Sequence, residues 1–379
     1  MRIGILTLPP HSNFGNILQT YALQTTLTRM GHEVSVLKGT WQYPVSLLRM
    51  PEVYLKRFIK KFILGQNIAI NQEKQYRLER AAIDVNTKKF LDRYIRFTYV
   101  KHLKSIRTSD FDAIVVGSDQ VWRKSYFSGS WKNEPFENSF LAFTKGWNIK
   151  RIAYAGSYGE DTWILNESET AKCKECARLF RGISVREKSA VALCRDHLDC
   201  KAVHVLDPTM LLCADDYLDL ITDVKPRNQG SLLCYMLDID QTKRDMIEQI
   251  AKYYGLKAFF VNSEFENKQK SLSERVQPPV EEWLAGFRDA KMVVTDSFHG
   301  TVFSIIFGKP FLTIGNPKRG MTRFTSLLSL FNLNNRLFTG GNVPFESMEE
   351  MEGQLRQAHQ HLDEMRIFSK NFLSESLKG

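Results

Sequence analysis

The sequence predicts an α/β fold divided into two domains. With 379 residues, the chain is too long for one compact core, so we expect two domains. Its first forty residues follow a strand, loop, helix, strand order, and a second such series begins near Ser231. Between them, several short apolar runs end in small or charged residues. This alternation is typical of parallel sheets covered by helices.

The first unit predicts a strand at Arg2 to Leu8, a helix from Ile17 that ends at Gly31, and a strand at residues 32–37. The loop before the helix, PPHSNFGN, lacks the G-x-G-x-x-G pattern of dinucleotide-binding loops. Backbone amides and asparagine side chains at a helix start can hold a phosphate or sugar hydroxyls. An ordinary asparagine-capped turn explains the same residues equally well. The candidates in this loop are Asn13, Gly15 and Asn16.

Basic residues gather in one segment. The formal net charge is +10, but residues 49–104 hold fourteen Lys or Arg against five Asp or Glu, and the rest of the chain is almost balanced. Within residues 53–64, VYLKRFIKKFIL, apolar and cationic side chains fall on opposite helical faces. Such a helix could lie on an anionic membrane surface, or its apolar stripe could pack on its own domain. Nucleic acid is not an expected partner, because no recognised binding motif accompanies the charge.

Composition further narrows the class of protein. The first strand meets Pro9 and Pro10 too early for a signal peptide, and no apolar run is long enough to cross a bilayer. We therefore expect a cytoplasmic protein. Cys173 and Cys176 have C-x-x-C spacing, but a continuous helix is predicted there without a Gly or Pro turn. No metal site and no cofactor are expected.

Four apolar strands in the middle of the chain, predicted at residues 111–116, 151–154, 182–185 and 203–206, end in polar residues. A parallel sheet gathers the carboxyl ends of its strands along one edge, so residues far apart in sequence could converge there. Each residue taken alone could instead cap a helix or pair with a neighbour. The strand-end residues are Ser118, Asp119, Gln120, Ser157, Arg186, Glu187 and Asp207.

The second α/β unit contains the most informative stretch, MVVTDSFHGTVFSII, at residues 292–306. It predicts a buried strand from Met292 to Thr295, a polar turn, and a helix starting near Thr301, a corner where α/β proteins place ligands. Asp296 and His299 are expected to face a cleft. Alternatively, Asp296 and Ser297 merely cap the helix, and His299 is a satisfied polar residue behind it. Polar residues near 348–378 predict one or two surface helices.

Several motifs resemble the polysaccharide pyruvyl transferases. In chain order they are NFGNILQTYALQ, DAIVVGSDQVW, RIAYAGSYG, ISVREKS, VLDPTMLL and VTDSFHGTVFSIIFGKPF. The resemblance implies two Rossmann-like domains facing each other across a cleft, as in glycosyltransferase B folds. It also implies transfer of pyruvate from phosphoenolpyruvate onto two hydroxyls of a hexose, with a cyclic ketal and phosphate as products.

In this family the arginine of V-R-E and the histidine before glycine are associated with the donor, which implies Arg186 and His299. Phosphoenolpyruvate carries a phosphate and a carboxylate, which suit the planar forks of Arg186 and Arg323. Histidine changes protonation near neutral pH and is apt to protonate the donor's methylene. Asp119 or Asp296, with Glu187 third, would accept the proton of each attacking hydroxyl.

One position departs from the family pattern. Many relatives have arginine two residues before the histidine, where this chain has Ser297. The missing donor contact would be supplied by Arg323, Arg319 or Lys309. Gly300 belongs to the same turn.

The resulting prediction is a transferase that pyruvylates a hexose of a cell-surface polysaccharide or of its lipid-linked precursor. A nucleotide-sugar glycosyltransferase and a non-catalytic sugar-binding protein of the same fold remain the alternatives. The expected domains are residues 1–215, with a basic insertion at about 45–104, and residues 228–345, followed by helices at 346–379 that could cross back to the first domain.

Overall fold

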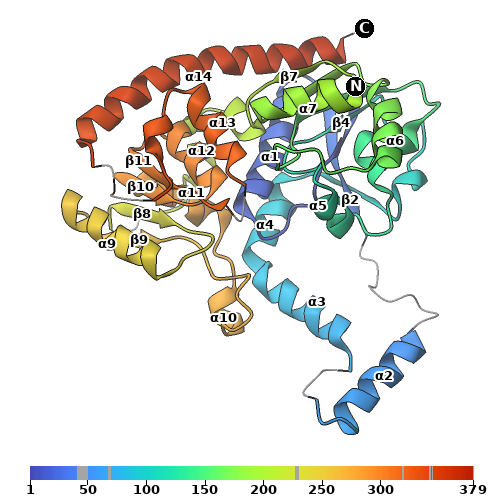
Figure 1. The fold of residues 1–379 in the computed structure, drawn as a ribbon, viewed down its shortest axis with the longest axis horizontal. Helices are drawn as coiled ribbons and strands as arrows, with labels where there is room; N and C mark the ends of the chain where they lie inside the picture. The colour runs from blue at the N-terminus through green and yellow to red at the C-terminus, as the bar shows by residue number, and fades with distance from the viewer. Residues whose placement is uncertain are drawn as a thin grey trace.

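The computed structural model describes residues 1–379 except 41–49, 67–69, 227–229, 318–319, 341–342, 344 and 379. Within that part of the chain, two all-parallel sheets form two α/β domains (Figure 1). The first sheet has seven strands in the order β3-β2-β1-β4-β5-β6-β7, and the second has five in the order β12-β11-β10-β8-β9. Together they make the expected pair of Rossmann-like domains, as in glycosyltransferase B folds.

The strands of the first domain are short, and those in the middle of the sheet are mostly buried, as the continuous apolar runs predicted. They are β1 (Arg2–Leu6), β2 (Glu33–Gly39), β3 (Phe97–Val100), β4 (Ala113–Val116), β5 (Lys150–Gly156), β6 (Gly182–Val185) and β7 (Ala202–His204). One face packs on α1 (Phe14–Arg29), α4 (Val85–Tyr94) and α14 (Met348–Leu377). The other packs on α5 (Lys124–Ser130), α6 (Glu167–Ala177) and α7 (Lys188–Leu198).

The second domain is also a parallel sheet covered by helices, but its sheet is smaller. Its strands are β8 (Leu232–Tyr235), β9 (Ala258–Phe260), β10 (Met292–Thr295), β11 (Phe311–Ile314) and β12 (Leu337–Phe338). Its helices are α9 (Gln241–Tyr254), α10 (Leu272–Arg275), α11 (Val280–Asp289), α12 (Phe298–Ile306) and α13 (Thr322–Leu330), and α8 (Ala214–Leu218) precedes the sheet. The apolar core that contains α11 and α12 is continuous with that of α1, so the two domains share one core.

A single long helix closes the molecule. Figure 1 shows α14 running across both domains. On the second domain, His359 Nε2 lies 2.6 Å from the carbonyl oxygen of Ile305. On the first, Arg366 donates to the carbonyl of Met210, and Lys150 donates to the carbonyl of Leu377. The tail therefore ties the second domain back to the first.

The basic segment expected as an insertion is only partly one. Its last part, α4 and β3, belongs to the first domain, because β3 pairs with β2 and extends the sheet. The remainder forms an arm of α2 (Met50–Phe62) and α3 (Gln72–Ile83) that projects from the body in Figure 1. No residue of α2 is buried. The alternative that its apolar stripe packs on its own domain is therefore wrong.

Two further sequence expectations can be placed. Helix α12 begins at Phe298 and not near Thr301, because Ser297 caps it and the turn residues form its first turn. Cys173 and Cys176 lie buried on α6 in the core of the first domain, as free thiols. Among the helices that the structure describes, none combines the length and the apolar character needed to span a bilayer.

Candidate functional site

Asp207 lies at the centre of a buried polar cluster between the domains. It follows β7, and its Oδ2 accepts hydrogen bonds from Arg186 Nη1 at 2.7 Å and from Ser118 Oγ at 3.5 Å. Its Oδ1 accepts from the amide and the hydroxyl of Thr209. Burial alone would raise the pKa of Asp207, but the neighbouring His299 and Arg186 outweigh it and lower this pKa well below its usual range. Asp207 therefore carries a negative charge in the folded protein.

His299 brings the second domain into this cluster. It is the second residue of α12, and its Nε2 lies 3.7 Å from Asp207 Oδ2. That distance is too long for a hydrogen bond but suits an ion pair when the imidazole is protonated. Nε2 is buried and has no hydrogen-bond partner among the described residues. The opposite side of the ring lies against Gly15.

Two arginines flank the ring of Phe298. The guanidinium carbon of Arg186 lies 4.6 Å from the ring centroid, and that of Arg323 lies 5.5 Å from it. Burial tends to lower the pKa of Arg186, but the carboxylates of Asp207 and Glu187 raise it. Burial and the charge of Arg186 lower the pKa of Arg323 to about 10, so both arginines are cationic at neutral pH.

Helix N-termini add positive potential at the same place. Four helices begin within two residues of a residue of the cluster or of one that touches it: α1 at Gly15, α7 at Glu187, α12 at His299 and α13 at Arg323. Unpaired amides and the helix dipole favour an anion at such ends. The carboxylates of Asp207 and Glu187 offset the two arginines, so the helix starts supply the remaining positive potential, which suits a small anionic ligand.

Glu187 and Ser157 form the adjoining wall. Ser157 Oγ donates to Glu187 Oε1 at 2.7 Å, while Oε2 of Glu187 is buried without a hydrogen-bond partner in the described chain. Arg186 Nη2 is likewise buried without one. Buried polar groups left unpaired are costly, so a bound ligand is a natural way to satisfy them. The strand-end residues of β5, β6 and β7 therefore converge as their position in a parallel sheet predicted.

The start of α1 connects both domains to the cluster. Asn13 caps the helix by accepting from the amide of Asn16. Phe14 stacks on Trp283 of the second domain, with ring centroids 5.4 Å apart. Asn16 Nδ2 donates to Asp119 Oδ2 at 3.0 Å. Asn13 therefore caps α1, and Asn16 positions the side chain of Asp119. The loop is more than an ordinary turn, because Phe14 also contacts the second domain.

Asp119 faces a cavity beside the cluster. It has a left-handed backbone, with φ of 66°, and its Oδ1 accepts from the amide of Gln120 at 2.8 Å. The side-chain oxygen of Gln120 is taken by Arg123. The cavity measures about 350 Å³ and is bordered by Asn13, Asn16, Asp119 and Tyr126 from the first domain and Phe265 and Glu266 from the second. A hydroxyl compound in this cavity would meet the Asp119 carboxylate.

Asp296 has a different environment from the one expected. It is completely buried, and it accepts hydrogen bonds from the amides of Leu237 and Asp238 and from Lys243 Nζ at 2.6 Å. Asn316 adds a fourth donor at 3.3 Å. A carboxylate surrounded by donors in this way holds the ends of β8 and β10 together. The geometry therefore does not favour Asp296 as a base.

The remaining candidates of the second domain are placed as follows. Ser297 caps α12 by accepting from the amide of Gly300 at 3.4 Å, and a side chain at Gly300 would overlap Thr295. Lys309 does not join the cluster, because it precedes β11 and so lies at the opposite edge of the sheet, where it donates to the carbonyl of Arg288. Arg319 lies outside the described residues.

Two central residues were not assigned a site role from the sequence. Asp207 was noted only as a strand-end residue after β7, whereas Arg186, which follows β6, was also identified by its family motif. Phe298 looked like a turn residue, but it contacts both arginines. The residues that Asp207 and Phe298 contact lie far from them in the sequence. These contacts can therefore be recognised only once the strands are assembled into sheets.

Comparison with known protein families finds a match for most of the chain. The model of the family described as polysaccharide pyruvyl transferase matches residues 13–318. No curated protein sequence matches the chain. Solved structures with a similar fold include the UDP-GlcNAc 2-epimerase from Neisseria meningitidis bound to UDP-GlcNAc, with 10% identity, coverage of 100% of this chain and 99% of that one, and a TM-score of 0.49. The UDP-GlcNAc 2-epimerase from Methanocaldococcus jannaschii has 12% identity, coverage of 95% and 92%, and a TM-score of 0.45.

Proposed function

Since the chain belongs to the polysaccharide pyruvyl transferase family, a family of transferases, we propose that it moves pyruvate from phosphoenolpyruvate onto two hydroxyls of a hexose in a polysaccharide or its precursor. The product is a cyclic ketal, and phosphate is released. The observation that carries the donor assignment is that Arg186 and His299, from different domains, both approach Asp207 Oδ2, at 2.7 and 3.7 Å.

The donor is proposed to bind at the two arginines. Arg186 Nη1 is engaged by Asp207, which orients the guanidinium and leaves Nη2 for the ligand. Arg323, whose guanidinium also contacts the ring of Phe298, provides a second cation. A phosphate and a carboxylate require such separate, fixed donors. Phe298 contacts both guanidinium groups and so helps to fix their positions.

His299 is proposed as the acid. Its proton passes to the methylene carbon of the donor, which becomes a methyl group, and C2 becomes electrophilic. The Asp207 carboxylate stabilises the protonated imidazole that this step consumes. One acceptor hydroxyl then bonds to C2, and the second replaces phosphate, which leaves with the C2–O bond electrons. Asp119, beside the cavity, is proposed to take the proton of each hydroxyl in turn; one of these protons restores the imidazolium of His299, and the other leaves with phosphate.

Phosphate release tests the reaction. The wild-type protein, phosphoenolpyruvate and candidate glycans should yield phosphate and a pyruvylated sugar, and the His299→Ala variant should yield neither while keeping its fold. Nucleotide diphosphate release from UDP-sugars, in place of phosphate, would support a glycosyltransferase. No heat on titration with phosphoenolpyruvate would contradict the donor assignment and favour a non-catalytic sugar-binding protein.

An anionic membrane is proposed as a further partner, through α2. Leu55, Phe58 and Phe62 are 61%, 49% and 60% exposed, and Lys56, Arg57, Lys60 and Lys61 accompany them on the helix. Apolar side chains beside cations are what a helix lying in a lipid interface needs. A membrane position would suit a cytoplasmic enzyme whose acceptor is lipid-linked.

The arm is also linked to the cleft. In α3, Arg80 Nη2 lies 2.9 Å from His11 Nδ1 and donates to Ser12 Oγ at 3.1 Å, and His11 borders the cavity at Asp119.

Flotation with anionic liposomes tests the membrane proposal. Reversing Lys56, Arg57, Lys60 and Lys61 to Glu should abolish binding, whereas reversing four exposed lysines elsewhere should not. The control lysines are Lys89, Lys132, Lys201 and Lys252.

A further inference from the structure

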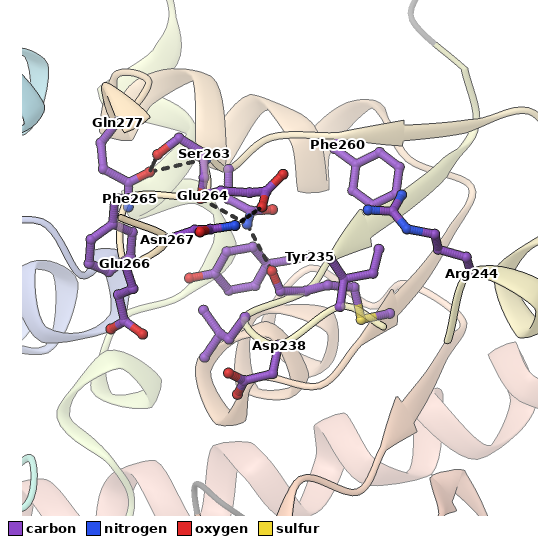
Figure 2. A pocket seen from close by; sticks show the side chains of 14 residues that line it. Tyr235, Asp238, Arg244, Phe260, Ser263, Glu264, Phe265, Glu266, Asn267 and Gln277 are labelled. Atoms are coloured by element: carbon purple, nitrogen blue, oxygen red, sulfur yellow. Dashed lines mark hydrogen bonds between the residues drawn. The ribbon is translucent and has the colours of Figure 1, made fainter. Parts of the chain in front are cut away.

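The second domain contains a cavity that the proposed donor site does not use. It measures about 520 Å³, within the roughly 300–1,000 Å³ range of small-molecule pockets. Residues 236–239 after β8 and residues 262–267 after β9 form its walls (Figure 2). It therefore lies at the carboxyl edge of the sheet, where α/β domains bind ligands.

Aromatic rings line this cavity at both ends. In Figure 2, Phe260 and Arg244 line one end, and Phe265 and Glu266 line the other. Phe260 is 46% exposed although it is the last residue of a strand. A partly exposed ring offers a flat apolar face, which suits the C–H face of a sugar ring.

The charge of the cavity selects against anions. Its lining contains the carboxylates of Asp238, Glu264 and Glu266 and one cation, Arg244, while Lys270, which is not part of the lining, lies 3.7 Å from Glu264 Oε1. Phosphate or nucleotide groups would be repelled here, in contrast to the arginine cluster. Carboxylates are, however, strong acceptors for hydroxyl groups. A neutral ligand rich in hydroxyls matches both properties.

Asn262, which borders the cavity, has a side-chain acceptor that the described chain does not pair. Asn262 Nδ2 donates to the carbonyl of Met236 at 2.8 Å, which fixes the amide. Its Oδ1 is buried and has no hydrogen-bond partner in the described part of the chain. A ligand hydroxyl would satisfy this atom, which otherwise costs free energy.

The cavity adjoins the proposed reaction site. Phe265 and Glu266 border both this cavity and the one at Asp119. Tyr235, on its wall, contacts the ring of Phe14, the residue before Gly15, which touches His299. A glycan could thus extend from one cavity into the other.

We propose that this cavity holds a neutral sugar unit of the acceptor glycan, next to the unit that receives pyruvate. The inference rests on the proposed function and names the chemistry of its acceptor. It assigns Phe260 to stacking on the sugar ring, Asn262 Oδ1 and Glu264 to accepting its hydroxyls, and the cavity's negative charge to excluding nucleotides.

Ligand-detected saturation-transfer NMR on the full chain tests this assignment. The probes are the methyl glycosides of glucose, galactose and mannose, N-acetylglucosamine, and UDP. At least one neutral sugar should receive saturation on its ring protons, and Phe260→Ala should weaken its binding about fivefold or more. Phe368→Ala is the matched control, because Phe368 is also 46% exposed but lies on α14.

Three results would overturn the inference. They are the absence of binding by every neutral sugar, binding that is unchanged in both Phe260→Ala and Asn262→Leu, and displacement of the bound sugar by UDP. Calorimetry with phosphoenolpyruvate on the same samples separates this inference from the proposed function. Donor heat that persists while sugar binding fails removes only the cavity assignment, and sugar binding without donor heat removes only the proposed reaction.

Discussion

Gly15 of the first domain lies directly against the imidazole of His299 in the second, so that a Cβ at position 15 would overlap the ring. Its neighbours explain why the approach is so close. Phe14 is anchored on Trp283 of the second domain, and Asn16 is bonded to Asp119 of the first. The start of α1 therefore sets the position of the imidazole relative to the first domain.

Replacing Gly15 with alanine should lower the turnover number sharply while leaving the protein folded. The added methyl group must displace the His299 ring from its present position beside Asp207, and a displacement of about 1 Å can cost about a hundredfold in rate. Phosphate release and thermal unfolding measure the two effects. Gly353→Ala on α14 is the control, because its nearest neighbour lies 3.7 Å away. Equal turnover in the two variants would show that the contact has no role.

Replacing Asp119 with asparagine should reduce turnover by roughly 10²–10⁴-fold, the usual contribution of a general base. Its left-handed φ of 66° is a conformation that asparagine tolerates well, and the loss of one of the two hydrogen bonds that Asp119 accepts should cost only about 1 kcal/mol of stability. Steady-state phosphate release and urea denaturation together check this prediction.

Asp296→Asn provides the contrast. An asparagine amide cannot accept from all four donors around position 296, so this variant should lose stability, by about 3–5 kcal/mol, before it loses turnover at permissive temperature. A normal melting temperature together with abolished turnover would instead restore Asp296 as a candidate base.

The strands and their polar ends could be predicted from sequence because fully buried parallel strands are continuous apolar runs. Met292–Thr295 and Gly182–Val185 were located with the correct bounds for this reason. Lys309 was misplaced because closeness in sequence to His299 hides the length of α12 between them, which carries the chain to the opposite edge of the sheet. The arrangement around Asp207 was out of reach, since it depends on how two domains meet.

Asp207→Asn should make the protein less stable and its stability less dependent on acid pH. The folded-state pKa of Asp207 is lowered, so its charge contributes stability above about pH 4 that is lost progressively as the pH falls below that value. Removing the charge leaves Arg186 buried without its main partner, at a cost of about 3–5 kcal/mol. Urea denaturation between pH 3 and 7 measures both effects.

Asp112→Asn is the control for this comparison. Asp112 also pairs with an arginine, Arg2, but both side chains are more than two-fifths exposed, so solvent screens the pair and the loss should be small. If the two variants lost equal stability at pH 7, the buried ion pair would not deserve its central place in the site.

Replacing Arg186 with lysine should weaken phosphoenolpyruvate binding by roughly 10- to 100-fold, because a hydrogen bond to a charged group contributes about 1.5–3 kcal/mol. Lysine keeps the charge, but a single ammonium group cannot both hold Asp207 and reach the ligand as the two ends of a guanidinium can. Arg181→Lys is the matched control, because Arg181 precedes β6 at its exposed end while Arg186 follows it. Calorimetric titration should show the loss only at position 186, and equal affinity in both variants would place the donor elsewhere.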